Sequence, residues 1–236
     1  MEKNRINRFV QKYNLSGLIE SVKWDVEGTT LTTSFISDDK SVLGTVSTSE
    51  FDFEQGSYGV YDTTKFTKML SVLENDIELS TTKVEGKTTS LNISDKGTSA
   101  TYMLADLSVI PVVPDLKAVP PMNVQITLDD DFTSKFIKSK GALSESDTFT
   151  FECKNNNGEI ILGYSSINTN RISMKVDCKC DGDVSPISFS AKYLKEILNA
   201  NRGSKSANLQ ISSQGLAHIE FEKDNLTSKY YLVEIK

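Results

Sequence analysis

The chain has 236 residues, of which 38% are hydrophobic and 25% charged, and its formal net charge is −6. This composition is typical of a folded globular protein and excludes a largely disordered one. No apolar run approaches the length that spans a bilayer, and the basic N-terminus lacks the apolar stretch of a secretory signal, so we expect a cytoplasmic protein.

Helical periodicity predicts four helices, near residues 3–14, 63–74, 132–141 and 191–202. The rest of the chain is dominated by short alternating runs that predict strands. These runs cover residues 30–36, 90–94, 123–128, 148–153, 159–164, 171–178, 208–212 and 230–235. Dense turn sequences such as "EGKT" and "NNNG" separate them, which favours antiparallel meanders over parallel βαβ units.

Each predicted helix carries the same short pattern: a basic residue, an apolar residue, any residue and a second basic residue. The four copies begin at Arg5, Lys65, Lys135 and Lys192. The first and third copies start 130 residues apart, and the second and fourth 127 residues apart. This spacing predicts two tandem halves, each with two helices.

Charge is segregated between these helices and the rest of the chain. The four helical windows hold 12 basic and 2 acidic residues, whereas the remainder holds 14 basic and 30 acidic residues. One interpretation is that lysine and arginine, good helix formers, simply cover solvated faces. The other is a surface that meets the phosphates of a polyanion without reading its sequence. We favour the second, because glutamate is an equally good helix former and is nearly missing from these helices.

The cysteines give little support to a metal site. Cys153, Cys178 and Cys180 are an odd number in a chain of this size, and we expect reduced thiols. The run Cys178-Lys179-Cys180 could hold half of a metal site, but the sequence has no second pair of this kind. We therefore expect strand or loop cysteines, no metal and no cofactor.

No catalytic constellation can be assembled from the sequence, so we expect a protein that is not an enzyme. His218 is the only histidine, in an alternating strand-like run, and there is no GxxxxGK[ST] or GxGxxG phosphate loop. The acidic run from Asp129 to Asp131 could suggest a carboxylate metal cluster. Because it directly precedes a predicted helix, we expect a helix cap and first-turn charges instead.

Several segments, taken in chain order, resemble the sliding clamps, the ring-forming processivity factors of DNA polymerases. "YGVYDTTKFTKMLSVLENDIELST" (58–81) resembles the domain-one helix region of these clamps, especially those of T4-like bacteriophages. "TYMLADLSVIPVVP" (101–114) resembles the end of domain one running into the interdomain connector. "PISFSAKYLKEILNANRGSKSANLQIS" (186–212) and "SKYYLVEI" (228–235) are similar to the final helix and strands of proliferating cell nuclear antigen.

The resemblance implies an α+β fold with two tandem similar domains, each an antiparallel β-sheet structure with two helices, in a subunit of a closed homotrimeric ring. Domain one would cover residues 1–107, the connector 108–122 and domain two 123–236. The ring would encircle duplex DNA without sequence specificity and tether the replicative DNA polymerase. Further implied partners are an ATP-dependent clamp loader and, for a T4-like clamp, late-transcription factors. A viral clamp would work in the host cell cytoplasm, with no membrane partner.

The resemblance also assigns candidate site residues. The residues expected to face DNA are Arg5, Arg8, Lys12, Lys65, Lys68, Lys135, Lys138, Lys140, Lys192, Lys195 and Arg202. A pocket for client peptides would use residues of the connector and of the terminal strand, together with three looser matches: Ile110, Val112, Val113, Tyr231 and Val233, with Val42, Leu43 and Leu216. The subunit interface would join residues 99–105 of one copy to residues 171–178 of the next.

Two observations leave alternatives open. Read by itself, "LSVIPVVP" (107–114) predicts a buried strand ended by proline. The cellular antigen has Ala-Pro-Lys after its Tyr-Tyr-Leu, where this chain has Val233-Glu234-Ile235.

The alternative function is that of a monomeric two-domain β-rich structural or adaptor protein of a virion, whose lysine-rich helices are solvated faces.

Overall fold

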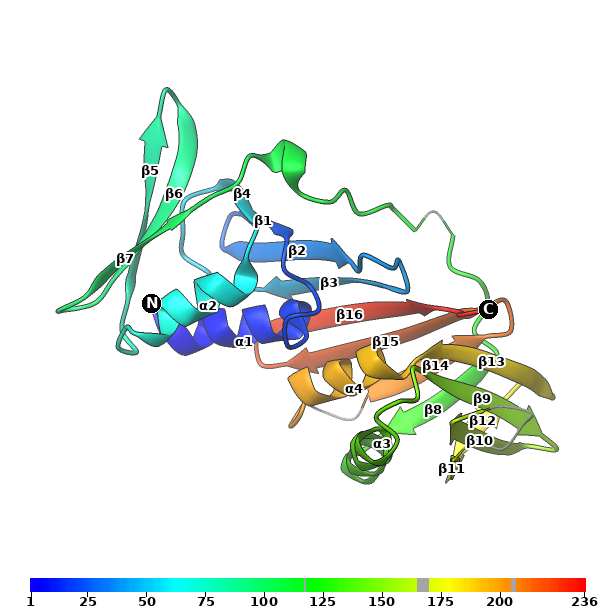
Figure 1. Cartoon of the computed structure of the whole chain (residues 1–236). Helices are drawn as coiled ribbons and strands as arrows, with labels where there is room; N and C mark the ends of the chain where they lie inside the picture. Colours follow the sequence, from blue (N-terminus) through cyan, green and yellow to red (C-terminus); the bar gives the residue numbers. More distant parts are fainter. Residues whose placement is uncertain (117, 165–169, 205–206) are drawn as a thin grey trace. The chain divides into compact units, whose positions relative to one another are not determined.

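The computed structural model describes residues 1–116, 118–164, 170–204 and 207–236 (Figure 1). Contacts divide the chain into two compact units. The first unit comprises Met1–Ile36, Gly44–Pro114 and Asp224–Ser228, and the second comprises Ser37–Leu43, Asp115–Lys223 and Lys229–Lys236. The expected connector, residues 108–122, is thus divided between the two units after Pro114. Its residue 117 lies outside the described residues. Residues 205–206, within the clamp-like segment 186–212, also lie outside them.

The elements of the first half are α1 (Lys3–Asn14), β1 (Val22–Glu27), β2 (Thr30–Ile36), β3 (Val42–Thr48), β4 (Gly56–Val60), α2 (Thr63–Ser71), β5 (Glu78–Val84), β6 (Lys87–Ser94), β7 (Ser99–Met103) and a short 3-10 helix η1 (Leu107–Val109). One run of neighbouring strands has the order β3-β2-β1-β4, and β5-β6-β7 form a separate three-stranded sheet.

The elements of the second half are β8 (Val124–Leu128), α3 (Asp130–Ala142), β9 (Thr148–Lys154), β10 (Asn157–Leu162), β11 (Ile172–Val176), β12 (Cys178–Cys180), β13 (Val184–Ser190), α4 (Ala191–Ala200), β14 (Ala207–Ser212), β15 (Leu216–Lys223) and β16 (Leu226–Val233). Here the four-stranded sheet has the order β11-β10-β9-β13, and the strands β12-β8-β14-β15-β16 are neighbours in another.

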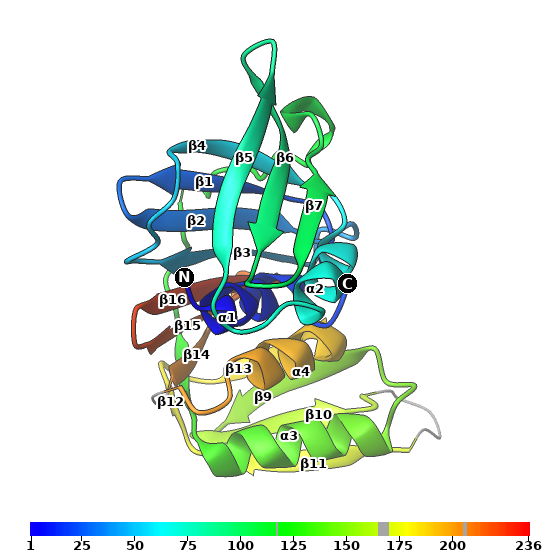
Figure 2. The same cartoon turned by 90° about the vertical axis from the view of Figure 1, so that its left-hand side faces the viewer.

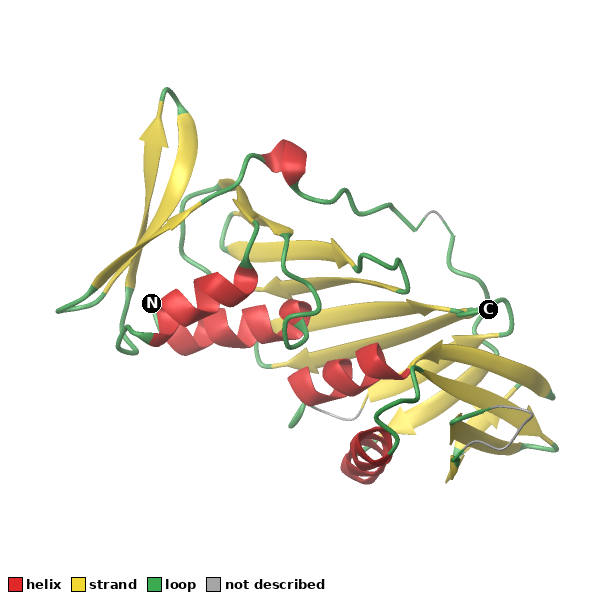
Figure 3. Ribbon diagram, viewed as in Figure 1, coloured by secondary structure: helices red, strands yellow, loops and turns green. Residues whose placement is uncertain are grey.

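The two halves repeat one architecture, as the spacing of the helical pattern predicts. In chain order each half contains a helix, a group of strands, a second helix and three further strands, and the second half has β8 before its first helix. Figure 3 shows the helices in red and the strands in yellow. The orders β3-β2-β1-β4 and β11-β10-β9-β13 correspond strand for strand. In the first, β1 pairs antiparallel with β2 and β4, and in the second β9 pairs antiparallel with β10 and β13, and β10 with β11. The four predicted helices are confirmed within two or three residues at each end, and no further α-helix occurs in the described ranges.

The segment 107–114 is not a buried strand. It contains η1 and an extended stretch with Leu107, Val109 and Val112 exposed. Pro111 and Pro114 lack the backbone N–H that a central strand must donate, which explains why the apolar run does not pair.

The core of the first unit is built on the apolar face of α1. Ile6, Phe9 and Tyr13 are fully buried, and the Phe9 ring meets the Trp24 ring edge to face at 5.7 Å between centroids. The Trp24 indole donates a hydrogen bond to the Tyr13 hydroxyl at 3.2 Å, and Trp24 also meets the ring of Phe66 from α2. In Figure 2 α1 and α2 lie side by side, held by this aromatic cluster.

The second unit has an equivalent core beneath α3 and α4. The rings of Phe136, Phe149 and Phe189 form a continuous buried row, with centroid distances of 5.5 and 5.7 Å. From α4, Leu194 and Ile197 are fully buried, at the i and i+3 spacing that places both on one helix face. Helices of both units therefore turn apolar residues inward and leave the opposite face to solvent.

The acidic run before α3 caps that helix, as the sequence predicts. Asp129 is the N-cap residue, and its Oδ1 accepts a hydrogen bond from the Phe132 N–H at 2.8 Å. Asp130 and Asp131 lie in the first turn, where negative charge is favourable.

Replacing this cap gives a direct test. We expect Asp129→Ala to lower the free energy of unfolding by about 1 kcal/mol, because a helix N–H loses its acceptor. Asp129→Asn keeps an oxygen acceptor and should stay close to the native value. Urea denaturation of the two variants measures the difference, and equal losses in both would show that the charge and not the cap is the cause.

No helix in the described part of the chain is long and apolar enough to cross a membrane.

Candidate functional site

The apolar residue of the repeated basic-apolar-any-basic pattern is buried in all four helices. Its exposed fraction is 0% for Ile6, Phe66 and Phe136 and 6% for Tyr193. The pattern therefore anchors each helix on its sheet through one side chain and places basic residues on either side of that anchor.

In the first unit, the basic residues of α1 and α2 differ in their neighbours. An Arg5 guanidinium nitrogen lies 3.2 Å from a Glu50 carboxylate oxygen, and Arg8 lies 3.2 Å from Asp224. Lys65 and Lys68 of α2 are exposed and make no ion pair with the part of the chain that the structure describes. The lysines of α2 are thus available to an external anion.

In the second unit, Lys135, Lys138 and Lys192 are exposed, and Lys195 is half-buried. The Lys135 ammonium lies 2.7 Å from Asp131 within the same helix, and Lys195 lies 3.3 Å from Glu196. The Lys135 pair is exposed and holds its cation weakly, whereas Lys195 pairs with the largely buried carboxylate of Glu196. Lys138 has no ion-pair partner among the described residues.

Arg202, expected near the end of the fourth helix, is exposed in the turn that follows α4. It is therefore placed at the end of the helix and not on its face.

Two expected DNA-facing lysines do not point outward. Lys12 is 5% exposed and Lys140 is 9% exposed, and the Lys140 ammonium donates a hydrogen bond to the Ser144 carbonyl oxygen at 2.7 Å. The reason is helical geometry. Lys12 follows buried Phe9 by three residues and Lys140 follows buried Phe136 by four, so both start from the apolar face. Attention to that spacing would have found them in the sequence.

The expected peptide pocket has its connector residues in the first unit. Ile110 directly follows η1 and is 6% exposed. Its Cγ1 atom lies 3.4 Å from the position that a Cβ atom would occupy if residue 59 were not glycine. Val113 is half-buried, whereas Val112 is 89% exposed. Of these three residues, Val112 offers the largest apolar contact to a partner.

The remaining pocket residues belong to the second unit, where three segments meet. The Val233 N–H donates to the Ser41 carbonyl oxygen, and the Glu234 N–H donates to the Gly215 carbonyl oxygen, both at 2.9 Å. These bonds bring Leu43, Leu216 and Val233, all half-buried, into neighbouring positions. Val42 is completely buried and belongs to the core.

Tyr231 adds an aromatic face to this region. Its ring stacks on the imidazole of His218 at 4.7 Å between centroids, and His218 Nδ1 lies 3.0 Å from the Gln210 side-chain oxygen. Burial lowers the pKa of His218. The only histidine of the chain thus packs against a tyrosine in a sheet.

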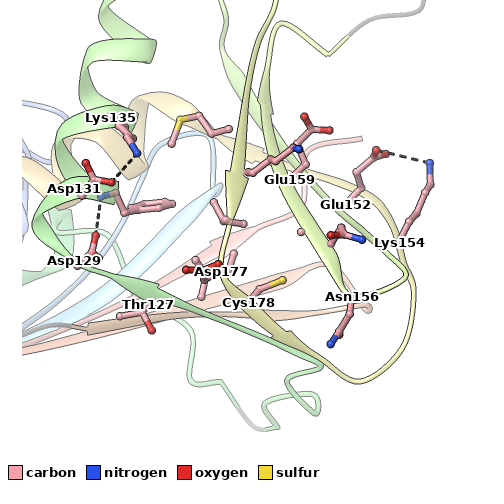
Figure 4. A pocket seen from close by; sticks show the side chains of 17 residues that line it. Thr127, Asp129, Asp131, Lys135, Glu152, Lys154, Asn156, Glu159, Asp177 and Cys178 are labelled. Atoms are coloured by element: carbon pink, nitrogen blue, oxygen red, sulfur yellow. Dashed lines mark hydrogen bonds and ion pairs between the residues drawn. The ribbon is translucent and has the colours of Figure 1, made fainter.

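A broad open groove lies in the second unit between α3 and the strands β9 to β11 (Figure 4). Its volume is about 890 Å³, and its lining is mainly polar, with Asp131, Lys135, Glu152 and Glu159 among the side chains around it. Met174 and Val176 of β11 contribute apolar surface to the same groove. The groove therefore borders β11, the end strand of its sheet.

The repeated units, each with two helices packed on antiparallel sheets, have the architecture of the DNA clamp fold. No protein-family model and no curated protein matches the chain. Among solved structures, that of proliferating cellular nuclear antigen from Entamoeba histolytica is similar over 100% of this chain and 96% of its own, with a TM-score of 0.73 and 19% sequence identity. The chain therefore has the α+β, two-domain fold of proliferating cell nuclear antigen, as the sequence resemblance implies.

Proposed function

We propose that this chain is the subunit of a homotrimeric DNA sliding clamp that encircles duplex DNA without sequence specificity. The observation that carries the proposal is the common placement of basic residues on the helices of two similar clamp-like units. In each unit two helices bury their apolar faces and turn cations such as Lys65, Lys68 and Lys138 to solvent.

The charge distribution supports contact with phosphates. The four helices hold eleven basic and three acidic residues, whereas the complete chain has 26 basic and 32 acidic residues. Side chains that contact only phosphates carry no sequence information, and their binding weakens with salt. Acidic surfaces elsewhere would keep DNA from binding outside the ring.

Ring closure is proposed to use two free sheet edges. β7 is an end strand of the sheet β5-β6-β7, and β11 is an end strand of the sheet β11-β10-β9-β13. The sequence expectation places the interface at residues 99–105 and 171–178, which contain these two strands. Edge strands offer unpaired backbone groups that a second copy can satisfy, and the groove beside β11 leaves room for the neighbour.

A charge placed on β7 should weaken the trimer. Met103 is 66% exposed, so Met103→Glu should change the stability of a single chain little. In the proposed interface the new carboxylate would lose water, and we expect at least about a tenfold weaker association. Light scattering over a dilution series measures this as a shift to lower mass.

The matched control is Val84→Glu, which adds the same charge at an exposed valine of β5, the opposite edge of the same sheet. It should leave the mass unchanged. Equal behaviour of the two variants would contradict the use of β7.

The proposed partners follow from the proposed function as a sliding clamp. A replicative DNA polymerase and other clients would dock short apolar segments on the surface of Leu43, Leu216, Tyr231 and Val233 and on the connector at Val112. A closed ring must be opened to reach circular DNA, so an ATP-dependent clamp loader is a further proposed partner. The resemblance of residues 58–81 favours a bacteriophage clamp acting in the host cytoplasm, with late-transcription factors among its clients.

Topological retention on DNA tests the proposed function. The protein is incubated at high concentration with a nicked plasmid circle, so that dissociated subunits can close around it, and the DNA is separated from free protein by gel filtration. We expect protein to remain with the circle and to be lost when one restriction cut linearises it. Equal retention on circular and linear DNA, or on neither, would contradict an encircling ring.

A further inference from the structure

The three cysteines of the chain meet at one place in the second unit. Cys153 is near the end of β9, whereas Cys178 and Cys180 come from β12, which belongs to a different sheet. Their three Sγ atoms all lie within 4.8 Å of one another, and those of Cys178 and Cys180 are 3.2 Å apart. All three are strand cysteines, as expected from the sequence, but the sequence does not predict that they meet.

The backbone explains why these side chains converge. β12 pairs with β8, with Cys178 opposite Ile126 and Cys180 opposite Val124. Residues two apart on a strand share a face, so both cysteines point one way and Lys179 points to solvent on the other side. Cys153 is completely buried, and its partner on β10 is Gly158.

Gly158 makes the space that the Cys178 thiol occupies. A Cβ on residue 158 would collide with Cys178 Sγ and would lie 3.2 Å from Val176 Cγ2 and 3.3 Å from the Phe151 ring. The backbone of Gly158 does not have a positive φ, so the conformation itself does not demand glycine. The lack of a side chain at this position is what lets a thiol from β12 reach the neighbourhood of Cys153.

We propose that Cys153, Cys178 and Cys180 form a binding site for a soft, thiophilic metal ion, zinc(II) or monovalent copper, held by three thiolates. With zinc–sulfur bonds of about 2.3 Å in tetrahedral geometry, two sulfur atoms are about 3.8 Å apart. The 3.2 Å between Cys178 Sγ and Cys180 Sγ is somewhat shorter than this value and the other pairs lie within 4.8 Å, so small rotations of the cysteine side chains suffice. Thiolates are the protein ligands that select these ions over magnesium or calcium.

A metal ion must displace the protons of these thiols. Burial raises the pKa of the Cys178 and Cys180 thiols, which disfavours their thiolate forms in the metal-free protein, and their sulfur atoms are at hydrogen-bond distance from each other. A bound cation replaces one proton on each of the three sulfurs and offsets part of their negative charge.

Access to the site is from the groove of the second unit. Cys178 lies at the wall of that groove, next to Asp177 (Figure 4). Cys178 and Cys180 are half-buried, whereas Cys153 closes the inner side. Because no histidine or carboxylate of the described residues joins the three sulfurs, zinc would take a water as its fourth ligand, and monovalent copper would be complete with three.

Metal titration of the full-length, reduced protein without oxygen tests the site. Zinc is added in competition with a chromophoric chelator, and monovalent copper is added in a separate titration. We expect one ion per chain for at least one of the two metals, with an affinity at least about a hundredfold lower in Cys153→Ser. The same ion should raise the melting temperature of the native protein.

Two further variants separate ligand loss from misfolding. Gly158→Ala keeps all three thiols but displaces Cys178, so it should lower metal affinity while circular dichroism stays native. Lys179 lies between two of the proposed ligands in the sequence and on the opposite face of β12. The variant Lys179→Ala should therefore bind the metal ion as the native chain does. Equal metal affinity of the native chain and the triple Cys→Ser variant would overturn the proposal, as would a Cys178–Cys180 disulfide that persists under reducing conditions.

Discussion

Replacing Lys65, Lys68, Lys135 and Lys138 together with glutamine is expected to weaken retention on circular DNA about tenfold or more at moderate salt. All four side chains are exposed on α2 and α3. In a trimer the substitution would remove these four charges from each of the three subunits. Each lost phosphate contact also makes the affinity for DNA less dependent on the salt concentration. The fold should remain intact, because within the described ranges the only ion pair removed is the exposed one between Lys135 and Asp131.

The control for this variant removes the same number of charges elsewhere. Lys23, Lys87, Lys96 and Lys154 are exposed and lie outside the four helices. Their joint replacement with glutamine should leave retention close to the native level. Retention is measured as the fraction of protein that elutes with a nicked plasmid over a series of salt concentrations. If both variants lose retention equally, net charge and not the helical surface is responsible.

Phe66→Ala is expected to cause the largest loss of stability among single substitutions considered for the first unit. The Phe66 ring is completely buried on α2 and meets the rings of Trp24 and Tyr102, each at 5.2 Å between centroids. Truncation removes both contacts and leaves a cavity, which costs about 3–5 kcal/mol in similar cores. Urea denaturation followed by tryptophan fluorescence measures it, since Trp24 is the only tryptophan.

A matched substitution at the end of the same helix is Val72→Ala. Val72 is the C-cap residue of α2 and is 66% exposed, so we expect a change within about 0.5 kcal/mol. A loss below about 1 kcal/mol for Phe66→Ala would contradict the assignment of this residue as the anchor of α2.

The helices and their repeat could be predicted because their signals are local. A basic-apolar-any-basic pattern with one buried residue identifies each helix, and the similar spacing of the copies, 130 and 127 residues, identifies the two halves. The strand pairings follow less directly, yet the run 30–36 coincides with β2 residue for residue. Helices and strands that are determined by local residue patterns are therefore predicted well from the sequence.

The errors have two different sources, one local and one in the tertiary structure. Lys12 and Lys140 were expected at the DNA-facing surface, but their positions three or four residues after a buried phenylalanine place their stems inside. The convergence of Cys153 with Cys178 and Cys180 depends on which sheets β9 and β12 join and on the absence of a side chain at Gly158. No spacing in the sequence encodes that meeting.

The native mass in solution tests the central claim most directly. Light scattering after size exclusion, over a dilution series, is expected to give about three times the 26.1 kDa mass of the chain, decreasing on dilution as subunits dissociate. Such a mass is required for a ring of six clamp-like domains. A strictly monomeric protein at high concentration would contradict the ring and leave the cationic helices as solvated surfaces of a monomeric structural or adaptor protein.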